Sequence, residues 1–122
     1  TDNVYLTQAD IRELQLAKGA MASGLRMLAP GPVAVLWLAG AFGNYIRLGS
    51  ARAIGLLPED LVVEPVGNTA LRGARMLLLA PSQRLERLRR ICAMAEHVEL
   101  AADPQFQDVY AESMALRPFE LR

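Results

Sequence analysis

Two stretches of this chain repeat one order of residue types: an apolar run, a small-residue turn that contains Gly-Asn, and a helical pattern. They are residues 38–44 (LAGAFGN) and 66–70 (VGNTA). The run before the first turn, residues 33–38, is apolar without alternation, which is typical of a strand covered on both faces. Parallel strands would place both turns at one edge of a sheet. The sequence therefore predicts an α/β fold.

Helical patterns predict the elements around these strands. Thr7 and Asp10 have the spacing of a capping box, which begins a helix that should end near Leu28. Further helices are predicted at residues 45–54, with Asn44 near the start, and at residues 70–80. The first helix should bury an apolar face with spacings of three and four, made of Ile11, Leu14, Met21, Leu25 and Leu28.

The second half of the chain adds a predicted strand at residues 61–66, a possible third strand at residues 97–100 and two amphipathic helices. One helix follows Pro81 and the other begins near Asp103-Pro104. Their inward positions are predicted to be Leu85, Leu88, Ile91, Cys92 and Ala95 in the first, and Phe106, Val109, Tyr110 and Met114 in the second. We predict one domain over residues 1–122, with a small, mostly parallel sheet flanked by helices.

Composition excludes several classes of function. Thirteen basic and thirteen acidic residues cancel, so no general field attracts nucleic acid or an anionic membrane. Cys92 is the only cysteine, which excludes an internal disulfide or a multi-cysteine metal site and fits a reducing cytoplasm. No apolar run is long enough to span a membrane. With 52% hydrophobic residues, some apolar surface is expected to face a neighbouring domain.

The two glycine turns are the main candidates for ligand binding. Glycine lets a backbone approach a ligand closely, and the N–H groups at a helix start favour anions, so such an edge suits a nucleotide or phosphate. Neither turn is a Walker loop or a complete dinucleotide fingerprint. The alternative is that the glycines only allow tight packing between strand and helix.

Other polar and small residues have structural interpretations beside the functional ones. Lys18 lies on the apolar stripe of the first helix, where it could reach a phosphate or a carboxylate. A lysine in such a position more often lays its aliphatic stem along the core and extends its amine to solvent, and this is the favoured interpretation. Gly19, Gly24 and Gly73 are unfavourable within helices and predict close packing. The basic run at residues 84–90 lacks aromatic residues and predicts a solvated face. His97 has no recognisable triad partner and is interpreted as structural.

The sequence also resembles a known family. The resemblance is carried in order by residues 6–20 (LTQADIRELQLAKGA), 38–46 (LAGAFGNYI), 55–58 (GLLP), 66–74 (VGNTALRGA) and 98–103 (VELAAD). These motifs span nearly the whole chain and closely resemble the C-terminal region of the reductive activators of corrinoid proteins. We therefore expect a part of an actin-like, ribonuclease H-like ATPase lobe of the actin, Hsp70 and sugar-kinase (ASKHA) superfamily.

This resemblance implies a function for a larger protein. Members of the family use ATP to return an inactive Co(II) corrinoid protein of a methyltransferase system to the Co(I) state. They typically carry an N-terminal [2Fe–2S] ferredoxin domain and a middle domain. The chain is thus expected to be a C-terminal, adenosine-binding piece, with ATP or ADP and Mg²⁺ as cofactors of the complete protein. Its partners would be the corrinoid protein and the other domains of its own polypeptide.

The resemblance also assigns residues. The turn after the first strand is similar to the adenosine motif of the superfamily, which makes Gly40, Ala41, Phe42 and Gly43 the best nucleotide contacts and Asn44, Gly67 and Asn68 weaker ones. No phosphate-binding hairpin, catalytic acid or metal ligand of the superfamily can be placed in this chain. It is therefore not expected to hydrolyse ATP alone. The rival hypothesis is a non-enzymatic module whose apolar surplus forms a dimer or an interdomain face.

Overall fold

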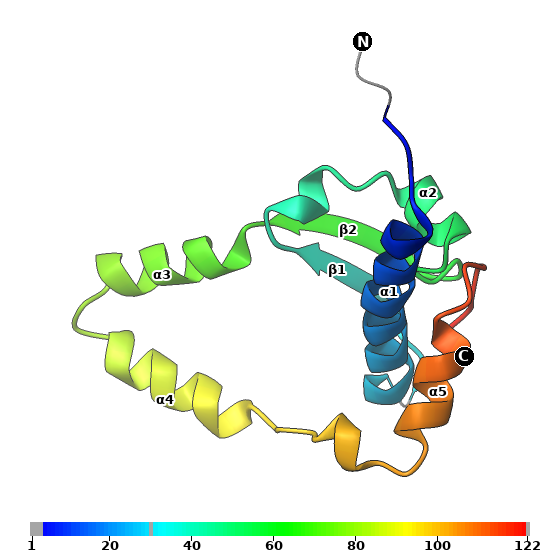
Figure 1. The fold of residues 1–122 in the computed structure, drawn as a ribbon. Coiled ribbons are helices and arrows are strands. Elements are labelled where there is room, and N and C mark those ends of the chain that lie inside the picture. Colours follow the sequence, from blue (N-terminus) through cyan, green and yellow to red (C-terminus); the bar gives the residue numbers. More distant parts are fainter. Residues whose placement is uncertain (1–3, 30, 122) are drawn as a thin grey trace. The chain divides into compact units, whose positions relative to one another are not determined.

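The computed structural model describes residues 4–29 and 31–121 and, at Phe42, the backbone alone (Figure 1). Its elements are α1 (Gln8–Leu28), β1 (Val35–Ala39), a 3₁₀ turn (Phe42–Asn44), α2 (Leu48–Ala53), β2 (Val62–Gly67), α3 (Thr69–Leu79), α4 (Arg84–Met94), a second 3₁₀ turn (Leu100–Ala102) and α5 (Phe106–Ser113). They form two compact units. The first unit comprises the described residues up to Ala34, Arg47–Val62 and the described residues from Glu99 onward; the second comprises Val35–Ile46 and Val63–Val98.

The start of α1 is fixed by the predicted capping box. The backbone N–H of Asp10 donates to Thr7 Oγ1 at 3.2 Å, and the Thr7 N–H donates to Asp10 Oδ2 at 2.8 Å. Two donors that a helix start leaves without partners are thereby satisfied. The hydrogen bonds from the Thr7 hydroxyl and backbone also lower the pKa of Asp10, because they favour the charged carboxylate.

In the first unit, α1 packs against α5 through small residues rather than through the predicted leucine and methionine face. The buried positions of α1 are Lys18, Gly19, Ala22 and Ser23, whereas Leu14, Met21 and Leu28 are 41–55% exposed. A Cβ at Gly19 would lie 3.0 Å from Cγ of Met114, the residue after α5, so a larger residue would force this contact apart. The prediction of close packing is confirmed at Gly19. It is wrong at Gly24 and Gly73, where no described atom lies within 4 Å of a Cβ.

Lys18 is buried rather than extended to solvent as predicted. Only 2% of the residue is exposed, and its Nζ donates to the carbonyl oxygen of Ala115, just beyond α5. Burial, followed by the charges of Arg26 and Arg117, lowers the pKa of Lys18. The amine therefore joins α1 to the C-terminal segment through a hydrogen bond to the backbone.

The C-terminal segment of the first unit also packs on the loop around α2. Gly55 has φ +71°, and a Cβ there would overlap the carbonyl oxygen of Arg117. Farther along, Glu59 N donates to Phe119 O at 2.9 Å, and Leu121 N donates to the Asp60 carboxylate at 2.9 and 3.1 Å. These contacts surround the apolar core of this unit, which includes Ala22, Ala51, Leu57, Leu61, Phe119 and Leu121.

The second unit contains a sheet of two parallel strands, β1 and β2 (Figure 1). Leu38 and Val63 are buried, but Trp37 is 70% exposed and donates from Nε1 to Glu64 Oε2 at 3.2 Å. The sequence predicted that both faces of β1 would be buried, but only the face that carries Leu38 is buried. The fold is nevertheless of the predicted class, α/β with a small parallel sheet.

Three local predictions in the connecting segments are wrong. Residues 45–54 are not one helix; a 3₁₀ turn ends at Asn44 and α2 begins only at Leu48. Residues 97–100 are no strand but lead into a 3₁₀ turn. The predicted inward residues of α4 are all exposed, because this helix meets no core in the described part of the chain. Phe106, Val109, Tyr110 and Met114 are half-buried, as their helical face requires.

Gly55→Ala is expected to destabilise the chain by about 2 kcal/mol or more, since it combines a left-handed backbone with an overlap at Arg117 O. Gly49→Ala is the control: it lies in α2 with no described atom within 4 Å of a Cβ, and is expected to be neutral or to stabilise by about 0.5–1 kcal/mol. Urea unfolding followed by circular dichroism measures both. Equal effects would contradict the proposed role of Gly55.

The unfolding free energy of the native chain is expected to increase relative to that of Lys18→Met as the pH rises toward 10.5, the ordinary pKa of lysine. The reason is that Lys18 binds its proton more weakly in the folded chain than in the unfolded chain, so the unfolded state is stabilised by protonation below that pH. Urea unfolding at a series of pH values would measure the difference in unfolding free energy. Arg12→Met, on the exposed side of α1, serves as control. A difference for Lys18→Met that does not change with pH would refute this expectation.

Candidate functional site

The carboxyl ends of β1 and β2 meet at the two glycine turns. Gly40 N donates to Gly67 O at 2.8 Å, which joins the residue after β1 to the last residue of β2. The prediction that both turns lie at one edge of a parallel sheet is confirmed. This arrangement matters because ligands of open parallel sheets bind outside the carboxyl ends of the strands.

Both glycines at this edge are required by backbone conformation. Gly40 has φ +107° and Gly67 has φ +71°, values that residues with a Cβ rarely adopt. No described atom lies within 4 Å of a Cβ built at either position. The two turns therefore reverse the chain without filling the space beside them, and a flat ligand could approach their backbone there.

Gly43 is a packing residue. Its N–H donates to Gly40 O at 3.2 Å, and a Cβ there would lie 3.1 Å from Leu38 Cγ and 3.2 Å from Leu38 O. The tight turn after β1 thus folds back on the last buried side chain of the strand. Ala41 and Asn44 are exposed on either side of it, and the side chain of Phe42 lies outside the described atoms.

Asn68 has a structural role that the sequence did not assign to it. Its Oδ1 accepts from the backbone N–H of Leu71 at 3.0 Å and so caps the first turn of α3. The cap uses only the oxygen of this amide, so the Nδ2 group remains a possible donor to a ligand. Because α3 begins directly after β2, the positive end of its helix dipole lies at the same edge as the turns.

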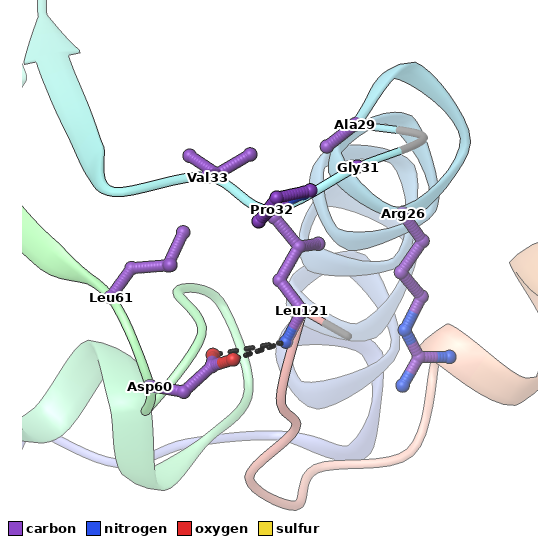
Figure 2. A pocket seen from close by; sticks show the side chains of 8 residues that line it. All are labelled: Arg26, Ala29, Gly31, Pro32, Val33, Asp60, Leu61 and Leu121. Atoms are coloured by element: carbon purple, nitrogen blue, oxygen red, sulfur yellow. Dashed lines mark hydrogen bonds between the residues drawn. The ribbon is translucent and has the colours of Figure 1, made fainter.

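A cavity of about 580 Å³ lies in the first unit, at a place that the sequence did not indicate (Figure 2). Its lining comes from three separate segments of the chain: Arg26, Ala29, Gly31, Pro32, Val33, Asp60, Leu61 and Leu121. No motif could have revealed it, because folding alone brings these segments together.

The polar groups of this cavity are already engaged. The Asp60 carboxylate accepts from Leu121 N, as the dashed lines in Figure 2 show. The Arg26 guanidinium lies 5.0 Å from the Phe119 ring centroid, 3.9 Å from Glu112 Oε2 and 3.5 Å from Ser113 Oγ. Both side chains hold α1, α5 and the C-terminal segment in place. The cavity therefore shows no set of groups arranged for catalysis.

Comparison with known proteins identifies the family of this chain. A family model described as the C-terminal domain of RACo, the ASKHA domain, matches residues 1–122. The chain belongs to this family. The corrinoid activation enzyme RamQ of Eubacterium limosum is 37% identical over an alignment of 116 residues, and the match covers 88% of this chain and 19% of that protein. No solved structure matches the chain.

Membership of the RACo C-terminal ASKHA family confirms the predicted resemblance and fold class. The chain spans about a fifth of the length of RamQ. Among the described residues, no helix is both long and apolar enough to cross a membrane.

Gly40→Ala is expected to destabilise the second unit by about 1–2 kcal/mol, because the open space around Gly40 leaves backbone strain as the main penalty. The strain should weaken the hydrogen bond to Gly67 O, so the amide of residue 40 should exchange with solvent faster. Hydrogen exchange followed by NMR tests this. Gly73→Ala, inside α3 and equally unobstructed, is the matched control and should stabilise α3 by about 1 kcal/mol. Unchanged exchange at residue 40 would contradict the structural role of this turn.

Proposed function

We propose that this chain is the adenosine-binding part of an ATP-dependent activator that returns inactive Co(II) corrinoid protein to the Co(I) state. Three findings support the proposal: the ASKHA family match, the corrinoid activation enzyme among its relatives, and the joined glycine turns. The hydrogen bond between Gly40 N and Gly67 O carries most weight, because it forms the strand edge at which a nucleoside would lie.

The residues at this edge fit the adenosine part of a nucleotide. Gly40 to Gly43 would lie against the nucleoside, since Gly40 leaves open space beside its backbone. Asn44, Gly67 and Asn68 would border it, and the start of α3 would favour its negative charge. Bound ATP with Mg²⁺ would supply the free energy for an unfavourable electron transfer.

The remaining parts of the reaction belong to the longer protein in this proposal. With Cys92 as its only cysteine, this chain cannot hold a [2Fe–2S] cluster by itself, so the electron donor would be an N-terminal ferredoxin domain. Phosphate and Mg²⁺ binding would come from the other lobe of the cleft. Residues 1–122 would act together as one C-terminal subdomain, in the cytoplasm, with the corrinoid protein as partner.

Titration with ATP and Mg²⁺ tests the proposed adenosine site at the two glycine turns. Amide shifts in NMR spectra are expected at residues 40–44 and at Gly67 and Asn68, because these backbones would contact the nucleoside. Gly40→Val should abolish the shifts by displacing the turn, whereas Gly73→Ala should preserve them. Shifts confined to the cavity beside Arg26 and Leu121, or shifts that survive Gly40→Val, would contradict the proposed site.

A further inference from the structure

Helices α3 and α4 carry apolar side chains that the described chain does not cover. No residue of either helix is buried. They form a V in Figure 1, diverging from the turn at residues 80–83, and we call residues 69–94 the arm. Eight of its nine large apolar side chains are 40–77% exposed, and the ninth, Leu77, is half-buried; the eight are Leu71, Met76, Leu78, Leu79, Leu85, Leu88, Ile91 and Met94.

These side chains make continuous faces on both helices. Leu71, Ala74 and Leu78 share one face of α3, and Leu85, Leu88 and Cys92 repeat the same spacing on α4. Between the helices lies a further apolar cleft of about 140 Å³, lined by Gly73, Met76, Leu77, Arg87 and Ile91. Helices of 11 residues are marginal in water without an apolar face packed on a partner. The arm therefore has the composition of an interface.

Charge restricts what can cover this interface. The arm holds Arg72, Arg75, Arg84, Arg87, Arg89 and Arg90 against one carboxylate, Glu86, although the chain as a whole has net charge zero. Pairing the arms of two copies would place these like charges face to face, which disfavours an arm-to-arm dimer. An acidic surface would instead complement these arginines.

The amino-acid composition of the arm favours a protein, rather than a membrane or a nucleic acid, as the acidic partner. The arm contains no lysine and no aromatic residue. The arm has leucine but neither the tryptophan nor the phenylalanine that anchors many interfacial membrane helices, and it lacks the aromatic side chains on which single-stranded nucleic acids stack. Arginine and methionine are instead enriched at protein interfaces where lysine is depleted, and arginine binds carboxylates in a bidentate manner.

We propose that the arm docks a protein surface with an apolar centre and a rim of aspartate and glutamate. Leucines of α3 and α4 fill the centre, and the arginines pair with the rim. This docking does not depend on nucleotide binding at Gly40, since the two features occupy different residues of the second unit.

An acidic amphipathic helical peptide, with leucines on one face and glutamates on its flanks, is the probe. It is expected to shift the amides of α3 and α4 in NMR titrations, and to bind more weakly as salt is raised. Leu78→Glu and, as a second variant, Arg90→Glu should each weaken binding about tenfold or more. Leu28→Glu, an exposed leucine of α1, is the matched control and should bind normally.

Binding measurements with other probes distinguish an acidic protein surface from other ligands of the arm. The same peptide with lysine for every glutamate should not bind. Tighter binding to phosphatidylserine vesicles, to duplex DNA or to the lysine peptide would overturn the proposal, as would concentration-dependent broadening of the arm amides without any probe, which would identify a second copy. Leu78→Glu and Arg90→Glu should keep the amide shifts that ATP causes at residues 40–44, so loss of docking and loss of nucleotide binding are separable outcomes.

Discussion

The hydrogen bond from Gly40 N to Gly67 O is the interaction on which the organisation of the second unit depends. It forms only if both glycines adopt positive φ and both strands run parallel, so that their carboxyl ends coincide. The start of α3 is placed at the same edge by this pairing, and the Asn68 cap completes it. The nucleoside site that we propose would therefore rest on backbone geometry rather than on any catalytic side chain.

The first unit is held together by contacts between segments far apart in the chain. Lys18 donates to Ala115 O, Asp60 accepts from Leu121 N, and Gly55 leaves room for the backbone near Arg117. Each contact ends on a backbone group of the C-terminal segment. That segment therefore lies beside α1 and α2 through a few specific positions, and its side chains Phe119 and Leu121 complete the core.

The second unit combines this backbone site with an arm of a different character. Its sheet and turns are ordered by local hydrogen bonds, whereas α3 and α4 expose most of their large side chains. Arginine beside exposed leucine is the basis of the proposed docking of an acidic protein surface. Within the proposed corrinoid activator, the unit would therefore join nucleotide binding to protein docking.

The sequence by itself determined the elements whose signals are local. The Thr7–Asp10 capping box, the apolar strands and the Gly-Asn turns each act over a few residues, so the capping box, the parallel strands and their common edge were predictable. Tertiary structure alone decided which faces are buried. Ala22 and Ser23 of α1 are buried where leucines were expected, because the close approach of α5 favours small side chains. The apolar face of α4 is exposed although it was predicted to be buried. Hydrophobic periodicity shows that a helix has an apolar face, but not what covers that face.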